Sequence, residues 1–326
     1  NLTLRQKALI NEYKGSLFEF SVAKELSIIY GIESVFYQGL SLNSLKRLKT
    51  YEKELNCLDS NLIISINSMA KKVAKMSVRH EKLKNLSLEN ILLTGKERDS
   101  IFGEGDITLC KDNEDKISLS LKLIKKNSFV NTKSAGIKSF ISVYFSEYDI
   151  SLKSQEVLNQ FVHQSYESFA FKMCEKVGID YSGNFSLDWK SSGVSDLPGE
   201  LSHELSKVIY NLYGCLTEKI RELLERLLIL DQDKFINSLW PILGLSLPEM
   251  LQLNCEYSES KKGLLFTEPV IRERKSIRTI SIDGNSEKVR SSFLIKLDNI
   301  HLQIRVKPMN KFTVPGFKIN CSVKEY

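Results

Sequence analysis

Two stretches in which apolar and polar residues alternate, 107–109 and 117–123, restrict the fold of this chain most strongly. In the second stretch, Ser118, Ser120 and Lys122 alternate with apolar residues. Because successive side chains of a β-strand point to opposite faces, the pattern predicts a strand with one apolar and one polar face. Six polar residues, 111–116, separate the stretches and predict a hairpin.

Asp106 directly precedes the first stretch, so hairpin pairing is expected to place it beside Ser120 and Lys122. A carboxylate oxygen is a hard ligand that can hold Mg²⁺, and a nearby ammonium group can orient water or stabilise developing negative charge. The pair therefore suits phosphodiester hydrolysis. An ordinary surface hairpin with a polar outer face carries the same residue types and is the alternative.

Asp106, followed on the next strand by Ser120-Leu121-Lys122, resembles the core motif of the PD-(D/E)XK nuclease superfamily, and in particular Type II restriction endonucleases. That motif is an Asp and then (Glu/Asp)-X-Lys, so the sequence departs from it at Ser120. The resemblance implies an α/β (α+β) fold, with a restriction-endonuclease-like core whose central mixed sheet is flanked by helices. It also implies that Asp106 and the Leu121 carbonyl hold Mg²⁺, with Ser120 orienting the shell and Lys122 positioning water or phosphate.

The departure at Ser120 leaves one metal ligand to be supplied elsewhere. Residues 15–26 predict an amphipathic helix, and its Gly-x-x-Phe-Glu opening is similar to that of many Type II restriction endonucleases. The resemblance makes Glu19 the second metal ligand. The alternative is that Glu19 is a solvated helix residue.

A basic, polar segment follows the predicted catalytic strand and contains Lys125, Lys126, Lys133 and Lys138. Restriction enzymes similar in this region have a basic loop and then a helix beside the scissile phosphate. The resemblance implies that these lysines contact DNA.

The positive charge of the chain is concentrated near its C-terminus. The net charge is +6, and residues 261–326 alone contribute fourteen basic and six acidic residues, so residues 1–260 sum to −2. Short strands are predicted from residue 264 onward, and on the last one, 300–307, His301, Gln303, Arg305 and Lys307 share a face. Such side chains can contact groove edges and phosphates. The predicted recognition surface consists of Arg290, Gln303, Arg305, Lys307, Asn310, Lys311 and Lys318.

The Gly-, Ser- and Pro-rich segment 178–199 predicts a boundary between a nuclease core, residues 1–185, and a helical and β-rich C-terminal region, residues 186–326. In the second region we predict a long helix over 201–230, whose apolar stripe could be core or a dimer seam, and short helices over 233–240 and 247–253. The expected roles of residues 186–326 are DNA recognition and, if the protein is a homodimer, dimerisation. The choice between monomer and homodimer is left open.

Six scattered cysteines without a Cys/His cluster argue against zinc and favour buried thiols in a reducing cytoplasm. No run approaches the roughly 18 to 20 apolar residues of a membrane span, so no membrane partner is expected.

Three functions are consistent with these patterns. The first is a Mg²⁺-dependent, sequence-specific endonuclease that cleaves double-stranded DNA, as in restriction-modification. The second is a defence or repair nuclease without sequence specificity. The third is a DNA-binding protein of nuclease-like fold that Ser120 has made inactive.

Overall fold

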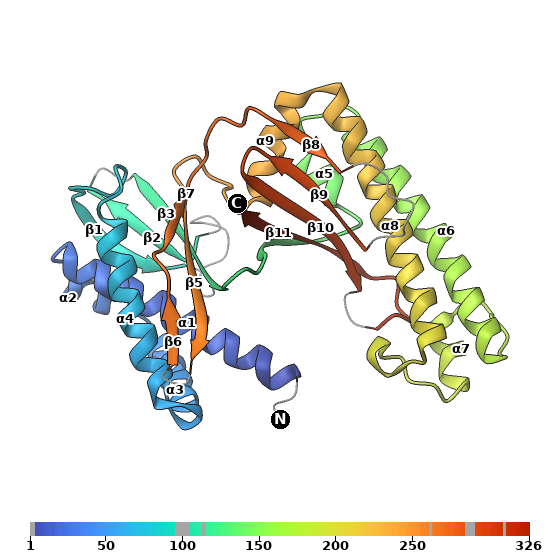
Figure 1. The fold of residues 1–326 in the computed structure, drawn as a ribbon, viewed down its shortest axis with the longest axis horizontal. Helices are drawn as coiled ribbons and strands as arrows, with labels where there is room; N and C mark the ends of the chain where they lie inside the picture. The colour runs from blue at the N-terminus through green and yellow to red at the C-terminus, as the bar shows by residue number, and fades with distance from the viewer. Residues whose placement is uncertain (1–3, 95–104, 113–114, 261–262, 284–290, 309–310) are drawn as a thin grey trace. The chain divides into compact units, whose positions relative to one another are not determined.

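The computed structural model describes residues 4–94, 105–112, 115–260, 263–283, 291–308 and 311–326 (Figure 1). The chain forms two compact units, each made of two separate segments. Unit 1 comprises residues 1–128 and 244–275, and unit 2 comprises residues 129–243 and 276–326. The chain therefore leaves unit 1 after β3, builds most of unit 2, returns to unit 1 and ends in unit 2.

Unit 1 consists of a mixed β-sheet and four helices of its N-terminal segment. The strand order is β1-β2-β3-β5-β6, and β7 also pairs with β5. Neighbouring strands are antiparallel except for β3 and β5, which are parallel. The elements are α1 (Leu4–Ile29), α2 (Glu33–Gln38), α3 (Leu42–Leu58), α4 (Ser60–Ser77), β1 (Leu88–Leu93), β2 (Ile107–Lys111), β3 (Lys116–Lys125), β5 (Leu251–Ser260), β6 (Gly263–Phe266) and β7 (Val270–Arg272).

One face of this sheet forms the hydrophobic core of unit 1. It packs against the buried side of α1, where Phe18, Val22 and Leu26 are almost completely enclosed. Leu119 of β3 and Leu253 of β5 are buried in the same cluster. Since odd-numbered residues of both strands supply the apolar face, the even-numbered residues occupy the opposite face. This alternation leaves a polar side on which a site can be built.

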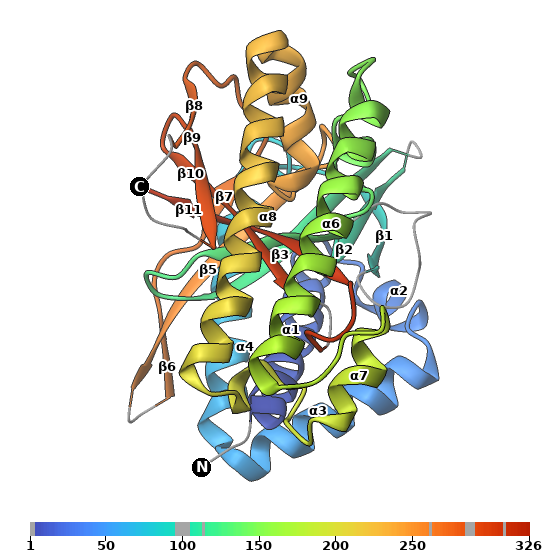
Figure 2. The same ribbon diagram turned by 90° about the vertical axis from the view of Figure 1, so that its right-hand side faces the viewer.

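Unit 2 consists of an antiparallel five-stranded sheet in the order β4-β11-β10-β9-β8 and a set of helices. Helices α6 and α8 lie side by side (Figure 2), and α8 contacts β9 and β10. The elements are β4 (Val130–Gly136), α5 (Phe140–Tyr144), α6 (Ser151–Val177), α7 (Phe185–Ser191), a 3₁₀ turn (Pro198–Glu200), α8 (His203–Leu230), α9 (Gln232–Ile242), β8 (Ile280–Ile282), β9 (Ser292–Leu297), β10 (Ile300–Pro308) and β11 (Phe317–Glu325).

Aromatic side chains join the helices of unit 2 to its C-terminal segment. The rings of Trp189 and Phe312 lie 5.2 Å apart in an edge-to-face arrangement, and those of Tyr166 and Phe317 lie 6.1 Å apart. Phe185 of α7 contacts both Trp189 and Phe312. Large buried rings contribute strongly to core stability. Residues 276–326 are therefore an integral part of the unit that residues 129–243 begin.

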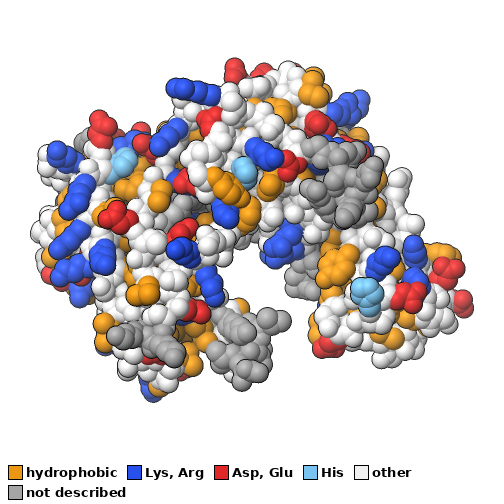
Figure 3. Space-filling model, viewed as in Figure 1, with side chains coloured by type: hydrophobic (Ala, Val, Ile, Leu, Met, Phe, Trp, Pro, Cys, Tyr) orange, Lys and Arg blue, Asp and Glu red, His pale blue; other side chains and the backbone are white. Residues whose placement is uncertain are grey.

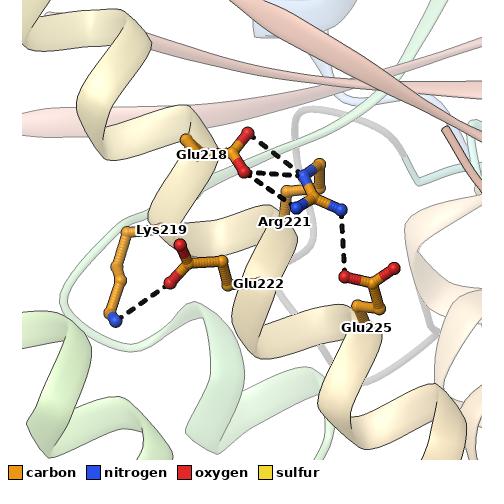
Figure 4. A network of polar contacts seen from close by, with 5 residues as sticks. All are labelled: Glu218, Lys219, Arg221, Glu222 and Glu225. Atoms are coloured by element: carbon orange, nitrogen blue, oxygen red, sulfur yellow. Dashed lines mark hydrogen bonds and ion pairs between the residues drawn. The ribbon is translucent and has the colours of Figure 1, made fainter. Parts of the chain in front are cut away.

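Helix α8 buries its apolar stripe within unit 2, which settles the choice between core and dimer seam in favour of core. The stripe is bordered by an ion-pair network (Figure 4). Arg221, only 7% exposed, donates to Glu218 at 2.8 Å and to Glu225 at 3.0 Å, and Lys219 pairs with Glu222 at 3.1 Å. All these partners are three or four residues apart on one helix, so they support the helix without tying it to another element.

The structure confirms a mixed α/β fold, the hairpin of β2 and β3, and the face alternation of β10. No helix in the described ranges is long and apolar enough to cross a membrane. Several expectations differ from the structure. The predicted boundary at residue 185 falls inside unit 2, because residues 129–243 pack with the C-terminal strands and residues 244–275 complete the sheet of unit 1.

Two local predictions were wrong, and each error concerns a strand whose partner is distant in sequence. Residues 251–253, predicted to end a short helix over 247–253, belong to β5, which pairs with β3. Residues 130–136, predicted as part of a basic loop, form β4, which pairs with β11. In both cases long-range backbone pairing determined the local structure.

We expect the Arg221 network to contribute little to the stability of unit 2 and the adjacent core to contribute much. Leu224→Ala, which removes a fully buried side chain one turn away, should cost about 2–5 kcal/mol. Arg221→Met keeps a buried aliphatic stem and should cost less than about 1 kcal/mol. Both tryptophans, Trp189 and Trp240, lie in unit 2, so tryptophan fluorescence during urea unfolding reports on this unit. Equal losses of unfolding free energy in Leu224→Ala and Arg221→Met would contradict the expectation.

Candidate active site

Asp106 directly precedes β2, and its carboxylate lies beside Ser120 and Leu121 of β3. Ile107 pairs with Leu119, and the Asp106 N–H donates to the Leu119 carbonyl at 2.8 Å. The Asp106 carboxylate accepts hydrogen bonds from the Leu121 N–H at 2.6 Å and from the Ser120 hydroxyl at 3.4 Å. The expected convergence of Asp106 with Ser120 is therefore confirmed.

Gly105 allows the segment before β2 to approach β3 closely. A Cβ atom at this position would lie 2.9 Å from the Ser118 Cβ, a separation that would force one of the two residues to move. The Thr94 hydroxyl donates to the Gly105 carbonyl at 2.8 Å, and the Thr94 N–H donates to the Asp106 carbonyl at 3.0 Å. The hydrogen bonds from Thr94 hold the segment that carries Asp106 against β1, and Gly105 lets this segment approach β3 because it has no side chain.

Lys122 lies on the same polar face as Ser120, two residues farther along β3, and is partly exposed. Burial raises the pKa of the Asp106 carboxyl above its ordinary value. The positive charge of Lys122 and the hydrogen bonds from Leu121 and Ser120 act in the opposite direction. The positive charge of Lys122 thus favours the ionised form of the Asp106 carboxyl, against the effect of burial.

Strands β5 and β7 extend the polar face with residues that the sequence analysis did not identify. Ser120 pairs in register with Gln252, and Lys122 pairs with Asn254. Arg272 of β7 is only 4% exposed and donates to Gln252 Oε1 at 2.7 Å. A row of polar residues thus runs from Asp106, before β2, through Ser120 of β3 and Gln252 of β5 to Arg272 of β7.

The signal for these residues was present in the sequence. Residues 251–256 alternate between apolar side chains and Gln252, Asn254 and Glu256, which is the same period of two that identified β3. The alternation alone predicts that these residues share one face of a strand. To place them beside Ser120 and Lys122, one also has to know that this strand pairs with β3.

The oxygen atoms near Asp106 are of the kind that Mg²⁺ prefers. They comprise the Asp106 carboxylate and the Ser120 hydroxyl, both hard ligands, and the Leu121 carbonyl stays a predicted ligand. No three Asp, Glu, His or Cys side chains gather as a metal-binding group in the described parts of the chain. This donor set suits an ion that retains several water molecules and uses one or two carboxylates.

Glu19, the predicted second ligand, lies in α1 and is partly exposed. It precedes the buried Val22 and Ala23 by about one turn, and α1 contacts β1 and β3. It does not belong to any three-membered acidic cluster among the described residues. Its assignment as a metal ligand stays a prediction.

The basic segment after β3 is divided between the two units. In unit 1, Lys125 and Lys126 are exposed, and Lys125 pairs with Glu259 at 3.6 Å. In unit 2, Lys133 lies on β4 with its Nζ 5.7 Å from the centre of the Tyr144 ring, and Lys138 is exposed beyond that strand. The four lysines do not form the single loop that was expected.

The predicted recognition residues that the structure describes lie mainly on one face of the sheet in unit 2. Arg305 stands between Ser292 and Asn320, and Lys307 is directly opposite Lys318. Burial and the neighbouring Arg305 charge lower the pKa of Lys307. Lys311 instead pairs with Asp196. Arg290 and Asn310 lie outside the described residues.

Basic side chains predominate among the described residues of this face. Lys and Arg side chains are interspersed with Asp and Glu across the side of the molecule drawn in Figure 3. The face that carries Gln303, Arg305 and Lys307 receives no carboxylate from the described residues of β4, β9, β10 and β11, and Asp283, which follows β8, pairs with Lys296 of this face at 2.8 Å. Like charges directly opposite each other destabilise a sheet, so a bound anion would relieve the Lys307–Lys318 repulsion.

Comparisons with protein-family models, with curated proteins and with solved structures find no match.

We expect Asp106→Asn to stabilise the folded protein above neutral pH. The amide keeps the shape and can still accept the Leu121 N–H, but it cannot ionise in this buried place. Because the pKa of Asp106 is raised in the folded state, the wild type gains stability as the pH falls through that pKa, down to the unfolded value of about 3.9. The advantage of the variant should therefore shrink with falling pH.

Differential scanning calorimetry of both proteins between about pH 5 and 8 measures this difference. Glu54→Gln, which alters an exposed carboxyl of α3, is the matched control and should show no such trend. An Asn variant that is least stable at high pH would mean that the folded state favours the ionised carboxylate.

Proposed function

We propose that this protein is a Mg²⁺-dependent endonuclease that hydrolyses phosphodiester bonds of double-stranded DNA, with its active site on the polar face of the sheet in unit 1. The observation that carries the proposal is the hydrogen-bonded contact of the Asp106 carboxylate with Ser120 and Leu121 of β3, the strand whose polar face also carries Lys122. The resemblance of Asp106 and Ser120-Leu121-Lys122 to the PD-(D/E)XK motif supports a restriction-endonuclease-like core.

Asp106, the Leu121 carbonyl and the Ser120 hydroxyl would hold the ion, with Glu19 as a further candidate ligand. When bound, Mg²⁺ supplies Lewis-acid polarisation of the phosphate and stabilises negative charge. The Leu121 N–H fixes one oxygen of the Asp106 carboxylate, so the other is directed away from the backbone. Ser120 orients the same carboxylate, which is a role that needs no charge.

Lys122 donates hydrogen bonds to the attacking water or to a non-bridging phosphate oxygen. The water oxygen forms a bond to phosphorus, and one phosphorus–oxygen ester bond breaks. The water gives up a proton to solvent, and the leaving oxygen takes one from solvent. Lys122 neither gives up nor accepts a proton in this step, and its contribution is positioning and charge.

DNA would be held by the face of the unit 2 sheet that carries Gln303, Arg305, Lys307 and Lys318. Lysines on this face suit phosphate contacts, while Arg305 and Gln303 have the donor patterns that recognise base edges. Lys125, Lys126, Lys133 and Lys138 are further candidates for contacts with the backbone. Sequence-specific cleavage, as in a Type II restriction enzyme, is the specificity that the motif resemblance favours.

The proposed setting is the cytoplasm. All six cysteines lie in the described part of the chain and none forms a disulfide. Burial raises the pKa of the Cys255 and Cys321 thiols to about 12, which keeps both protonated and unreactive. Cleavage of both strands of a symmetric site would use a two-fold homodimer.

Cleavage of plasmid and phage DNA in Mg²⁺ tests the proposed function. We expect fragments with the wild type, none with EDTA, and losses of at least about 100-fold for Asp106→Ala and Lys122→Met. Glu54→Gln alters an exposed residue of α3, a helix that carries none of the proposed site residues, so this variant should cut normally. Discrete fragments would support sequence specificity, and a smear would indicate a non-specific nuclease. DNA binding without any cleavage would favour the inactive DNA-binding protein.

A second experiment tests the DNA surface in unit 2. Lys307→Ala combined with Lys318→Ala should weaken DNA binding in EDTA and reduce the dependence of log K on log salt by about one to two units. Lys153→Ala combined with Lys172→Ala removes two exposed lysines of α6 and serves as a charge-matched control. Equal effects of the two double variants, measured by fluorescence anisotropy, would show that the sheet face has no special role.

A further inference from the structure

Asn254 carries a buried oxygen with no hydrogen-bond partner among the described residues. Its side chain is only 8% exposed, and its Oδ1 atom is enclosed. Leaving such an acceptor unsatisfied destabilises the folded state, because its lost hydration is not replaced by a hydrogen bond. Native proteins keep few buried groups of this kind, and one that persists calls for an explanation such as a catalytic role or an ordered water.

The position of Asn254 connects this oxygen with the proposed active site. Asn254 on β5 pairs in register with Lys122 on β3, and the two strands are parallel. Adjacent strands lie about 4.7–4.9 Å apart, and residues in register project from the same face. The carboxamide therefore stands beside the side chain that we assign to positioning water or phosphate.

The two faces of β5 differ in what they contribute. Leu253 and Cys255, which flank Asn254, are buried in the hydrophobic core of unit 1 on the opposite face. Gln252, the preceding residue on the polar face, receives a hydrogen bond from Arg272. Asn254 is the next residue on this polar face, but no described group donates a hydrogen bond to its side-chain oxygen. Its neighbour on β3 is Lys122.

We propose that Asn254 is a positioning residue of the active site, with Oδ1 accepting a hydrogen bond from the attacking water while the Lys122 ammonium donates to the same water. This inference rests on the proposed function. Two fixed partners, one acceptor and one donor, define the orientation of a water molecule that a single lysine leaves free to rotate. Because Ser120 is not a carboxylate, the neighbouring strand supplies the acceptor that β3 lacks.

A role in positioning and a role in folding predict opposite effects of Asn254→Leu on stability. The leucine has a similar volume and removes the unsatisfied acceptor, so positioning predicts an unchanged or higher melting temperature. It also predicts a fall of about 10- to 100-fold in kcat with KM and DNA affinity in EDTA unchanged. Asn254→Asp keeps an acceptor oxygen and should retain more activity than Asn254→Leu. Ser258→Ala, on the same strand and face, is the control and should cut normally.

The outcomes separate this inference from the proposed function. If the wild type does not cleave DNA in Mg²⁺, the proposed function fails and the role of Asn254 fails with it. If the wild type cleaves and Asn254→Leu cleaves equally well, only the role of Asn254 is excluded. The same holds if the melting temperature and kcat fall together in Asn254→Leu and Asn254→Asp alike, because Asn254 would then be structural.

Discussion

The parallel pairing of β3 with β5 is the interaction on which the architecture depends. The two strands are separated in sequence by residues 129–243, which pack in the other unit. Parallel strands cannot be joined by a tight turn, so the chain must make a long excursion between them. When β5 returns, its register places Gln252 beside Ser120 and Asn254 beside Lys122. One backbone pairing therefore both completes the sheet of unit 1 and assembles its polar face.

That polar face is costly, which is the best argument that it serves a purpose. Ser120, Gln252 and Arg272 are buried, although apolar residues at these positions would have made an ordinary second core face. Burial also raises the pKa of Asp106, so the ionised form that would bind a cation is disfavoured in the folded protein. Proteins retain strained or destabilising groups where function requires them. We interpret the polar face as an active site whose charges would be balanced when metal and phosphate are bound.

The parts of the fold that could be predicted from sequence are those set by local alternation. The hairpin of β2 and β3 placed Asp106 beside Ser120, because its register depends only on residues 106–123. The faces of β10 followed from the same period of two. By contrast, β4 and β5 acquire their structure from partners far away in the chain, β11 and β3. The contribution of β5 to the site, and the division of the chain into units, depended on those distant pairings and could not be derived locally.

We propose that the face carrying Asp106 and Lys122 binds a divalent cation for phosphodiester hydrolysis. Anomalous diffraction from crystals of the full chain soaked with Mn²⁺, as a substitute for Mg²⁺, tests it most directly. We expect an anomalous peak about 2 Å from an Asp106 carboxylate oxygen that is absent from Asp106→Asn crystals. A peak that persists in the variant, or Mn²⁺ bound only at other carboxylates of the protein, would exclude a metal site at Asp106.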